Sequence, residues 1–205
     1  MKRILVILLL IVATVTAAST ATEAGRKNDN RPDGGGLNYG EYGRPATLDP
    51  ITSNEMISLR LTELIFNGLV GINEKQEIVP ELAEKWDRSA DSRTYTFFLR
   101  RDVMWHPKEG EEPKPFTADD VIFTCNIMMH PKTITPLKVR YEFISAVEKV
   151  DDYTVKFTLK RPILNALAKF SFKVIPKHGP SNPLYLTRED PFVRNPIGTG
   201  PYLLK

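Results

Sequence analysis

Apolar and polar residues alternate most clearly in two stretches near the middle of the chain. In residues 153–159, YTVKFTL, every second side chain is apolar, and residues 94–99, TYTFFL, nearly repeat the pattern. A period of two residues is typical of a β-strand with one buried face. We therefore predict strands at 94–99 and 153–159, and a hairpin turn at Asp151-Asp152 that joins the second strand to residues 143–150.

Apolar residues three and four positions apart predict the main helix at residues 118–129. Thr117 is the expected N-cap, because its hydroxyl can accept a backbone hydrogen bond at the helix start. Asp119 and Asp120 fall in the first turn, where carboxylates favour the positive end of the helix dipole. This assignment explains the acidic pair without catalysis.

Shorter patterns predict the remaining elements. Thr52 and Glu55 fit a capping box, which predicts a helix that ends at Asn67-Gly68. The other expected elements are strands at 37–42, 69–73, 172–175 and 202–204, and helices at 81–86 and from Pro162 to Phe170.

The N-terminal end predicts export from the cytoplasm. A short basic start at Lys2-Arg3 precedes an apolar run at 4–15, and small residues follow as far as Ala24. The run is too short to cross a bilayer comfortably, so residues 1–24 are expected to be a cleavable signal peptide. Residues 25–36 are polar and glycine-rich and are expected to form a flexible lead-in. No cysteine lies just after the apolar run, so a lipoprotein anchor is not expected.

Charge and cysteine content exclude several function classes. The formal net charge is +3, and Lys2 and Arg3 lie in the leader, so the mature chain is close to neutral and unlike a nucleic-acid-binding surface. Cys125 is the single cysteine, which rules out an internal disulfide and a cysteine-cluster metal site. Its helical spacing indicates a small buried apolar side chain.

No catalytic motif is present in the sequence. The three histidines, His106, His130 and His178, lack the spacing of a metal pair on a helix. There is no G-x-S-x-G motif, and Gly198-Thr199-Gly200 lacks the further residues of a nucleotide-binding loop. We therefore expect no catalytic residue, metal site or cofactor.

Two stretches resemble one family. Residues 86–106 read W-x-x-S-x-D-x-x-T-Y-T-F-x-L-R-x-D-V-x-W-H, and PFTADDV follows at 115–121. Residues 195–202 read NPIGTGPY, a tight turn in which the two glycines allow positive φ. This combination resembles the bacterial extracellular solute-binding proteins of family 5, the oligopeptide, dipeptide and nickel-type receptors of ABC importers. Residues 107–113 replace a shorter segment of the family and are expected to form a surface insertion.

The resemblance implies a mixed α/β, periplasmic binding protein-like fold with two lobes around a cleft. Residues 37–70 and 171–205 are expected to belong to lobe I, and residues 71–170 to form an inserted α+β subdomain. Family members are considerably longer, so the resemblance implies an incomplete chain whose second lobe is missing and lies beyond Lys205.

The implied function is capture without chemistry. A family member of this kind closes on a short peptide in the periplasm, acts as a monomer, and delivers the solute to an inner-membrane ABC permease. A receptor for nickel, an oligosaccharide or another small solute remains open, as does an exported hydrolase. No nucleic-acid partner is expected.

Ligand contacts are expected in three places. In the family the first strand and its exit border the cleft, and open sheets bind ligands beyond the ends of their strands. Trp105 ends a strand and enters a long loop, which places it at the edge of the cleft. Arg140-Tyr141 precedes a strand and is expected on the opposite wall, with an ordinary surface pair as the alternative. The expected ligand-binding residues are Tyr39, Gly40, Glu41, Ser53, Asn54, Trp105 and Tyr141.

Overall fold

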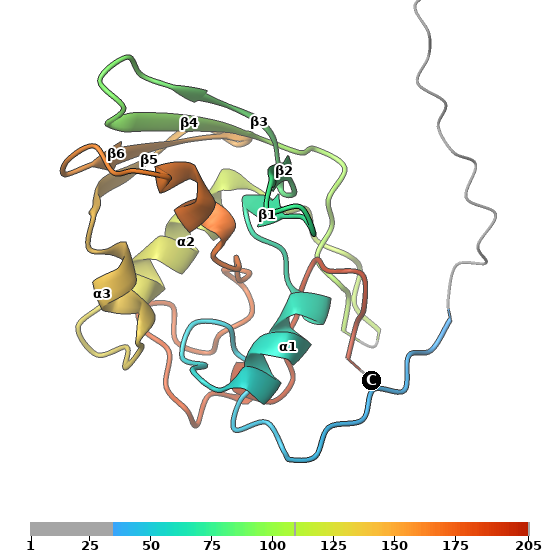
Figure 1. Ribbon diagram of the computed structural model, residues 1–205. Coiled ribbons are helices and arrows are strands. Elements are labelled where there is room, and N and C mark those ends of the chain that lie inside the picture. The colour runs from blue at the N-terminus through green and yellow to red at the C-terminus, as the bar shows by residue number, and fades with distance from the viewer. Residues whose placement is uncertain (1–34, 109, 205) are drawn as a thin grey trace, which may run out of the picture. The chain divides into compact units, whose positions relative to one another are not determined.

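The computed structural model describes residues 35–108 and 110–204 of the chain (Figure 1). The chain divides into two units, Met1–Asn38 and Tyr39–Lys205, and all helices and strands below belong to the second unit. The expected signal peptide lies outside the described residues. In chain order the elements are α1 (Met56–Ile65), β1 (Val70–Ile72), β2 (Ile78–Pro80), β3 (Ala83–Arg88), β4 (Thr94–Leu99), α2 (Ala118–Met129), α3 (Leu137–Tyr141), β5 (Ile144–Asp151), β6 (Thr154–Leu159) and two 3-10 turns, η1 (Ala166–Ser171) and η2 (Pro191–Val193).

An antiparallel sheet in the order β3-β4-β6-β5 carries the two strands predicted from alternation. The buried face of β4 holds Tyr95, Phe97 and Leu99, as the pattern predicts. The hairpin between β5 and β6 is also confirmed, with Asp151 opposite Thr154. Helix α2 packs against β5 and β6, so it covers one face of this sheet (Figure 1).

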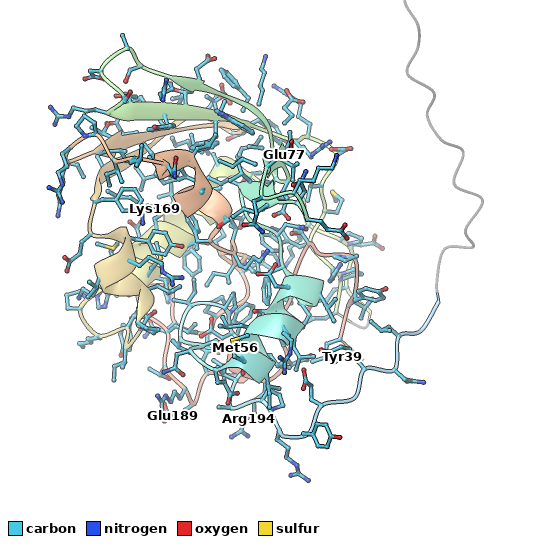
Figure 2. The ribbon with its side chains drawn as sticks, in the orientation of Figure 1. Tyr39, Met56, Glu77, Lys169, Glu189 and Arg194 are labelled. Atoms are coloured by element: carbon cyan, nitrogen blue, oxygen red, sulfur yellow. The ribbon has the colours of Figure 1, made fainter. Side chains whose placement is uncertain are left out.

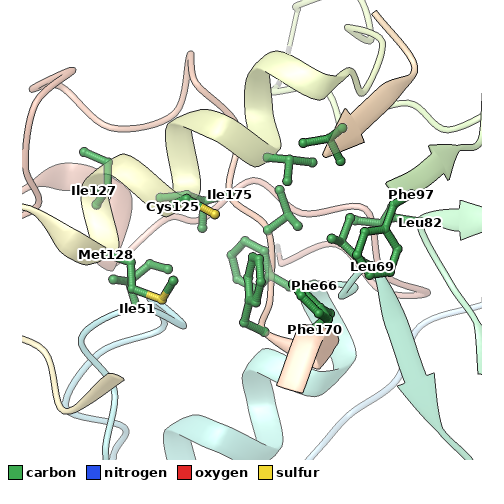
Figure 3. Packing of buried hydrophobic residues seen from close by; sticks show 14 of the residues in the cluster. Ile51, Phe66, Leu69, Leu82, Phe97, Cys125, Ile127, Met128, Phe170 and Ile175 are labelled. Carbon is green, nitrogen blue, oxygen red and sulfur yellow. The ribbon is translucent and has the colours of Figure 1, made fainter. Parts of the chain in front are cut away.

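Aromatic rings fill the space beneath the sheet. The ring centroid of Phe170 lies 4.8 Å from that of Phe97, 4.9 Å from Phe157 and 5.5 Å from Tyr95. Each buried phenylalanine of this kind contributes about 1.5–3 kcal/mol by leaving water. Figure 3 shows Phe170 among core side chains that come from segments far apart in the sequence.

Cys125 is part of the same core, as its helical spacing predicts. The side chain is buried, and burial raises the pKa of its thiol to about 12. A thiol with so high a pKa stays protonated at neutral pH and behaves as an apolar group.

Two predicted helices are wrong. Residues 83–88 form β3 instead of part of a helix, because the free edge of β4 pairs with them and sets Trp86 opposite Phe97. The segment after Pro162 forms only the short turn η1, since Asn165 adopts a left-handed conformation at φ 54° immediately before it. Both corrections come from contacts that local helical spacing cannot represent.

Three predicted strands are also wrong. Residues 37–42 and 202–204 have no strand partner, and a strand needs a neighbour for its backbone hydrogen bonds. Residues 172–175 make a single bridge, between Lys173 and Gly68. Beyond it, the backbone of Ile175 both donates to and accepts from the Thr124 hydroxyl of α2, which takes the place of a strand.

Residues 195–202 bend at 195 and at 200–201 without closing a hydrogen-bonded turn, and their glycines serve another purpose than the predicted one. Neither Gly198 nor Gly200 has a positive φ. A Cβ atom on Gly198 would lie 1.8 Å from the carbonyl oxygen of Ile65, and the N–H of Gly200 donates to that oxygen at 2.8 Å. Both positions therefore require glycine, because a side chain would collide with the end of α1.

Candidate functional site

The first expected contact region contains a cluster of three polar side chains. The Tyr39 hydroxyl donates to Glu41 at 2.9 Å, and the Arg60 guanidinium donates to both Glu41 carboxylate oxygens at 2.7 and 3.0 Å. The Arg60 contact, followed by the Tyr39 contact, lowers the pKa of Glu41 from its ordinary value. Glu41 is therefore an ionised group held in place by α1, which carries Arg60.

A buried carboxylate shapes the chain before α1. Asp49 is fully buried, and it accepts hydrogen bonds from the N–H groups of Ile51 and Thr52 and from the Thr52 hydroxyl. Burial raises the pKa of Asp49, and these hydrogen bonds act in the opposite direction. Because Thr52 is committed to Asp49, the predicted capping box is wrong, and Glu55 is the N-cap residue of α1.

Ser53 and Asn54 lie at this entrance to α1. Ser53 is 2% exposed, and its hydroxyl has no hydrogen-bond partner among the described residues. Asn54 is exposed beside it. A buried hydroxyl without a partner is uncommon in native proteins, because it loses hydration without recovering a hydrogen bond. The pair therefore offers one unsatisfied polar group and one accessible side chain.

A threonine joins this entrance to the segment that carries Tyr141. The Thr135 hydroxyl donates to the carbonyl of Ile51 and accepts from the N–H of Leu137, the first residue of α3, at 3.0 Å. Figure 1 shows the chain before α1 reaching the side of the molecule where α3 lies. The structure therefore links the surroundings of Ser53 and Tyr141 through a shared hydrogen-bonded contact.

Tyr141 is more buried than a surface residue. It is 4% exposed and packs edge-on against Phe172, with ring centroids 5.4 Å apart. Burial raises the pKa of its phenol, so the hydroxyl keeps its proton at neutral pH. Tyr141 and Arg140 line a depression of about 360 Å³ between α3 and η1.

Trp105 lies in the core, which differs from the expected position at the edge of a cleft. Its indole is 1% exposed, stacks edge-on against Phe116 at 6.0 Å, and donates to Asp120 at 3.2 Å. The long loop after β4 folds back, with the N–H of Trp105 bonded to the carbonyl of Lys114 at 2.8 Å. This return buries the ring, and the sequence pattern contains no sign of it.

Arg60 and Asp49 are the two residues of this region that the sequence analysis misses. Arg60 falls on the exposed face of a predicted helix, where a charged residue is unremarkable, and only the folded chain brings it to Glu41. Asp49 follows Thr47-Leu48 in a turn-rich segment. The role of Asp49 could have been predicted, since aspartates in turns often accept hydrogen bonds from the backbone N–H groups two or three residues later.

The described residues offer no preformed metal site. Across 35–108 and 110–204, no group of three His, Cys, Asp or Glu side chains lies close enough to hold an ion. Within the same residues, no helix has the length and apolar character of a membrane span. What the arrangement presents is an ordered ion pair, an unpartnered hydroxyl and a buried phenol.

Comparison with known proteins assigns the family. The profile of the bacterial extracellular solute-binding proteins, family 5 (middle region), matches residues 77–205. The chain belongs to this family. The match includes β3, β4 and residues 195–202, which carry the motifs from which the resemblance was predicted.

Family 5 relatives with known names agree with this assignment. The dipeptide-binding protein of Escherichia coli is 35% identical over 63% of this chain and 27% of its own length. The oligopeptide-binding protein AppA of Bacillus subtilis is 28% identical over the whole of this chain and 38% of its own length. The chain therefore spans about a third of the length of these curated relatives.

Solved family 5 structures confirm the predicted fold class. AppA in complex with a nonapeptide matches with a TM-score of 0.70 over 78% of this chain and 32% of AppA. NikZ from Campylobacter jejuni, in complex with Ni(L-His), matches with a TM-score of 0.68 and 34% identity over 78% of this chain and 31% of NikZ. The fold is that of periplasmic binding proteins. The division into lobe I and an inserted subdomain stays a prediction.

Proposed function

We propose that this chain belongs to the substrate-binding component of an ABC importer that captures short peptides in the periplasm and delivers them to an inner-membrane permease. The observation that carries the proposal is family 5 membership, together with relatives named for dipeptide and oligopeptide binding. Its action is binding without catalysis, as a monomer, and the relatives are binding proteins rather than enzymes.

The geometry before α1 supports capture of a polar ligand. The buried hydroxyl of Ser53 has no partner among residues 35–108 and 110–204 and lies beside the exposed Asn54, and a peptide backbone offers both donors and acceptors to such groups. The carboxylate of Glu41, fixed by Arg60, keeps lone pairs that can accept a further hydrogen bond from a peptide N–H. The proposed ligand contacts are Tyr39, Gly40, Glu41, Ser53, Asn54 and Tyr141, with Trp105 as buried support.

A titration of the purified chain with a panel of solutes tests the proposal. The panel contains di- to nonapeptides, the nickel–histidine complex and a neutral oligosaccharide, with binding followed by calorimetry and peptide integrity by mass spectrometry. We expect heat of binding with peptides and their recovery intact. Release of amino acids would establish a hydrolase instead. Binding confined to the nickel–histidine complex would favour the second candidate, which the NikZ structure suggests.

Ser53→Ala separates a ligand contact from a purely structural role. Removal of a buried, unpartnered hydroxyl leaves the free energy of unfolding unchanged or raises it by about 1 kcal/mol. If Ser53 contacts the peptide, the same variant weakens peptide binding although the fold is no less stable. Unchanged affinity in Ser53→Ala would remove Ser53 from the proposed contacts and leave the other residues untouched.

A further inference from the structure

Four basic side chains surround a groove next to Tyr141. One depression, of about 360 Å³, lies between α3 and η1, and a neighbouring one of about 660 Å³ extends to the end of β6. Arg140, Leu164 and Lys169 line both depressions, so the two are continuous. Lys160 and Arg161 line the larger one. We call this surface, with Arg140, Lys160, Arg161 and Lys169, the cationic groove.

The charge of the cationic groove is not neutralised within the described part of the chain. None of its four cations forms a salt bridge there, and Glu142 is the single acidic residue on its walls. Lys149 is a contrasting case, since it contacts both Asp119 and Asp152. A concave surface with unpaired charges of one sign focuses its potential and attracts ligands of the other sign.

The walls of the groove are held by the fold. Asn165, in its left-handed conformation, turns the chain into η1, and its carbonyl accepts from the N–H of Ala168 at 3.2 Å. Lys169 follows on η1, with its ammonium 5.7 Å from the ring centre of Phe143. Figure 2 shows Lys169 between the four-stranded sheet and α3. Its charge is therefore positioned by packing rather than carried on a free loop.

Apolar side chains are interspersed among these charges. Val139 is 77% exposed and Leu164 is 88% exposed, and both line the groove. The cations are spread along α3, the exit of β6 and η1 instead of converging on one point. Such a surface is complementary to an extended chain with several carboxylates on aliphatic stems, because stems and carboxylates both find partners.

We infer that the cationic groove binds acidic peptides through their glutamate or aspartate side chains. This inference rests on the proposed function and names the kind of peptide that the chain selects. A single phosphate would reach only part of the spread charge. A membrane surface is nearly flat on this scale and would leave the concave floor of the groove unfilled.

The test is calorimetry on the 205-residue chain with triglutamate, triglutamine and trilysine. We expect triglutamate to bind more tightly than triglutamine, trilysine to bind most weakly, and the triglutamate preference to shrink as salt is added. Arg140→Gln/Lys169→Gln removes the two cations that line both depressions, and we expect about tenfold weaker triglutamate binding with triglutamine unaffected. Lys160→Gln/Arg161→Gln provides a second groove variant should the first fail to fold.

Lys75→Gln/Arg194→Gln is the matched control, since it removes the same net charge at exposed positions outside the groove. An equal loss of triglutamate binding in this control would overturn the inference in favour of diffuse charge attraction. Equal affinity for triglutamate and triglutamine overturns the groove but leaves peptide capture standing. Absence of triglutamate binding would overturn the inference about the groove. Binding of triglutamine would then show whether the chain captures peptides at all. The chain could instead co-sediment with phosphatidylglycerol vesicles and not with phosphatidylcholine vesicles, and show no preference among the peptides. That result would overturn the inference and assign the groove to a membrane.

Discussion

Gly198 lies against the end of α1 so closely that no side chain fits there. An added Cβ would lie 1.8 Å from the Ile65 carbonyl oxygen, which is a backbone atom at the end of a packed helix and cannot turn aside as a side chain can. Gly40 is the opposite case, with nothing within 4 Å of its would-be Cβ. Two glycines of the same chain therefore have opposite tolerance to substitution.

Gly198→Ala is expected to lower the free energy of unfolding by more than about 4 kcal/mol, or to prevent folding, because α1 must move away. Gly40→Ala is the matched control and is expected to change it by less than about 1 kcal/mol. Urea unfolding of both variants measures the difference. Equal stability of Gly198→Ala and the parent chain would contradict the close approach.

At the scale of elements, the start of α2 is held by one carboxylate. Asp120 is 2% exposed and accepts from the N–H of Thr117 and the N–H of Lys177, each at 2.9 Å, and from the Trp105 indole at 3.2 Å. It thereby joins the helix start to the loop after β4 and to the segment after residue 175. Within the described part of the chain, its neighbour Asp119 makes only surface ion pairs, with Lys149 and Lys177.

Asp120→Asn is expected to destabilise the chain by about 3 kcal/mol, because an amide nitrogen in place of one oxygen cannot accept the hydrogen bonds that oxygen received. Asp119→Asn, one residue away with the same chemical change, is expected to cost less than about 1 kcal/mol, as surface ion pairs do. Thermal unfolding followed by circular dichroism compares the two. A larger effect at Asp119 would show that the helix is capped differently.

For the molecule as a whole, two histidines couple stability to acidity. His106 donates from Nε2 to the Gly200 carbonyl at 2.9 Å, and His178 lies edge-on to Trp105. Burial is the main cause that lowers the pKa of each imidazole from its ordinary value of 6.5. The unfolded chain therefore takes up protons at these positions before the folded chain does, and stability is lost as the pH falls.

Urea unfolding between about pH 8 and about pH 5 is expected to show full stability at the upper end and a decline that begins near pH 6.5. His106→Gln is expected to flatten this decline, because glutamine does not titrate. His130→Gln is the control, since His130 stacks on Tyr185 in a different part of the chain. A decline that stays as steep in His106→Gln would assign the effect to other groups.

Local patterns correctly predicted the elements in which the periodically spaced apolar residues form the buried face. The alternation at 94–99, the hairpin and the helix at 118–129 are confirmed, because one face of each meets the core. Patterns failed where a partner from elsewhere decided the outcome: β3 exists through β4, and residues 37–42 have no neighbouring strand. The spacing of apolar side chains along one segment does not indicate which other segment will pair with its backbone.

The candidate site divides in the same way. Sequence pointed to Tyr39, Glu41 and Ser53 through the family resemblance and to Tyr141 through its place before a strand. These ligand contacts stay a prediction. Arg60 beside Glu41 and the burial of Trp105 emerged only from the folded chain. Long-range contacts of this kind join residues that no window of local sequence contains.

By itself, the sequence determined the sheet's central strands and the main helix, because each is encoded in the spacing of neighbouring residues, and its motifs indicated the family by resemblance. Only the tertiary structure decided that Gly198 serves close packing, that Trp105 is buried and that four cations from α3, the exit of β6 and η1 line one groove. Those outcomes depend on distances between segments far apart in the chain, which are set when the core closes and not before.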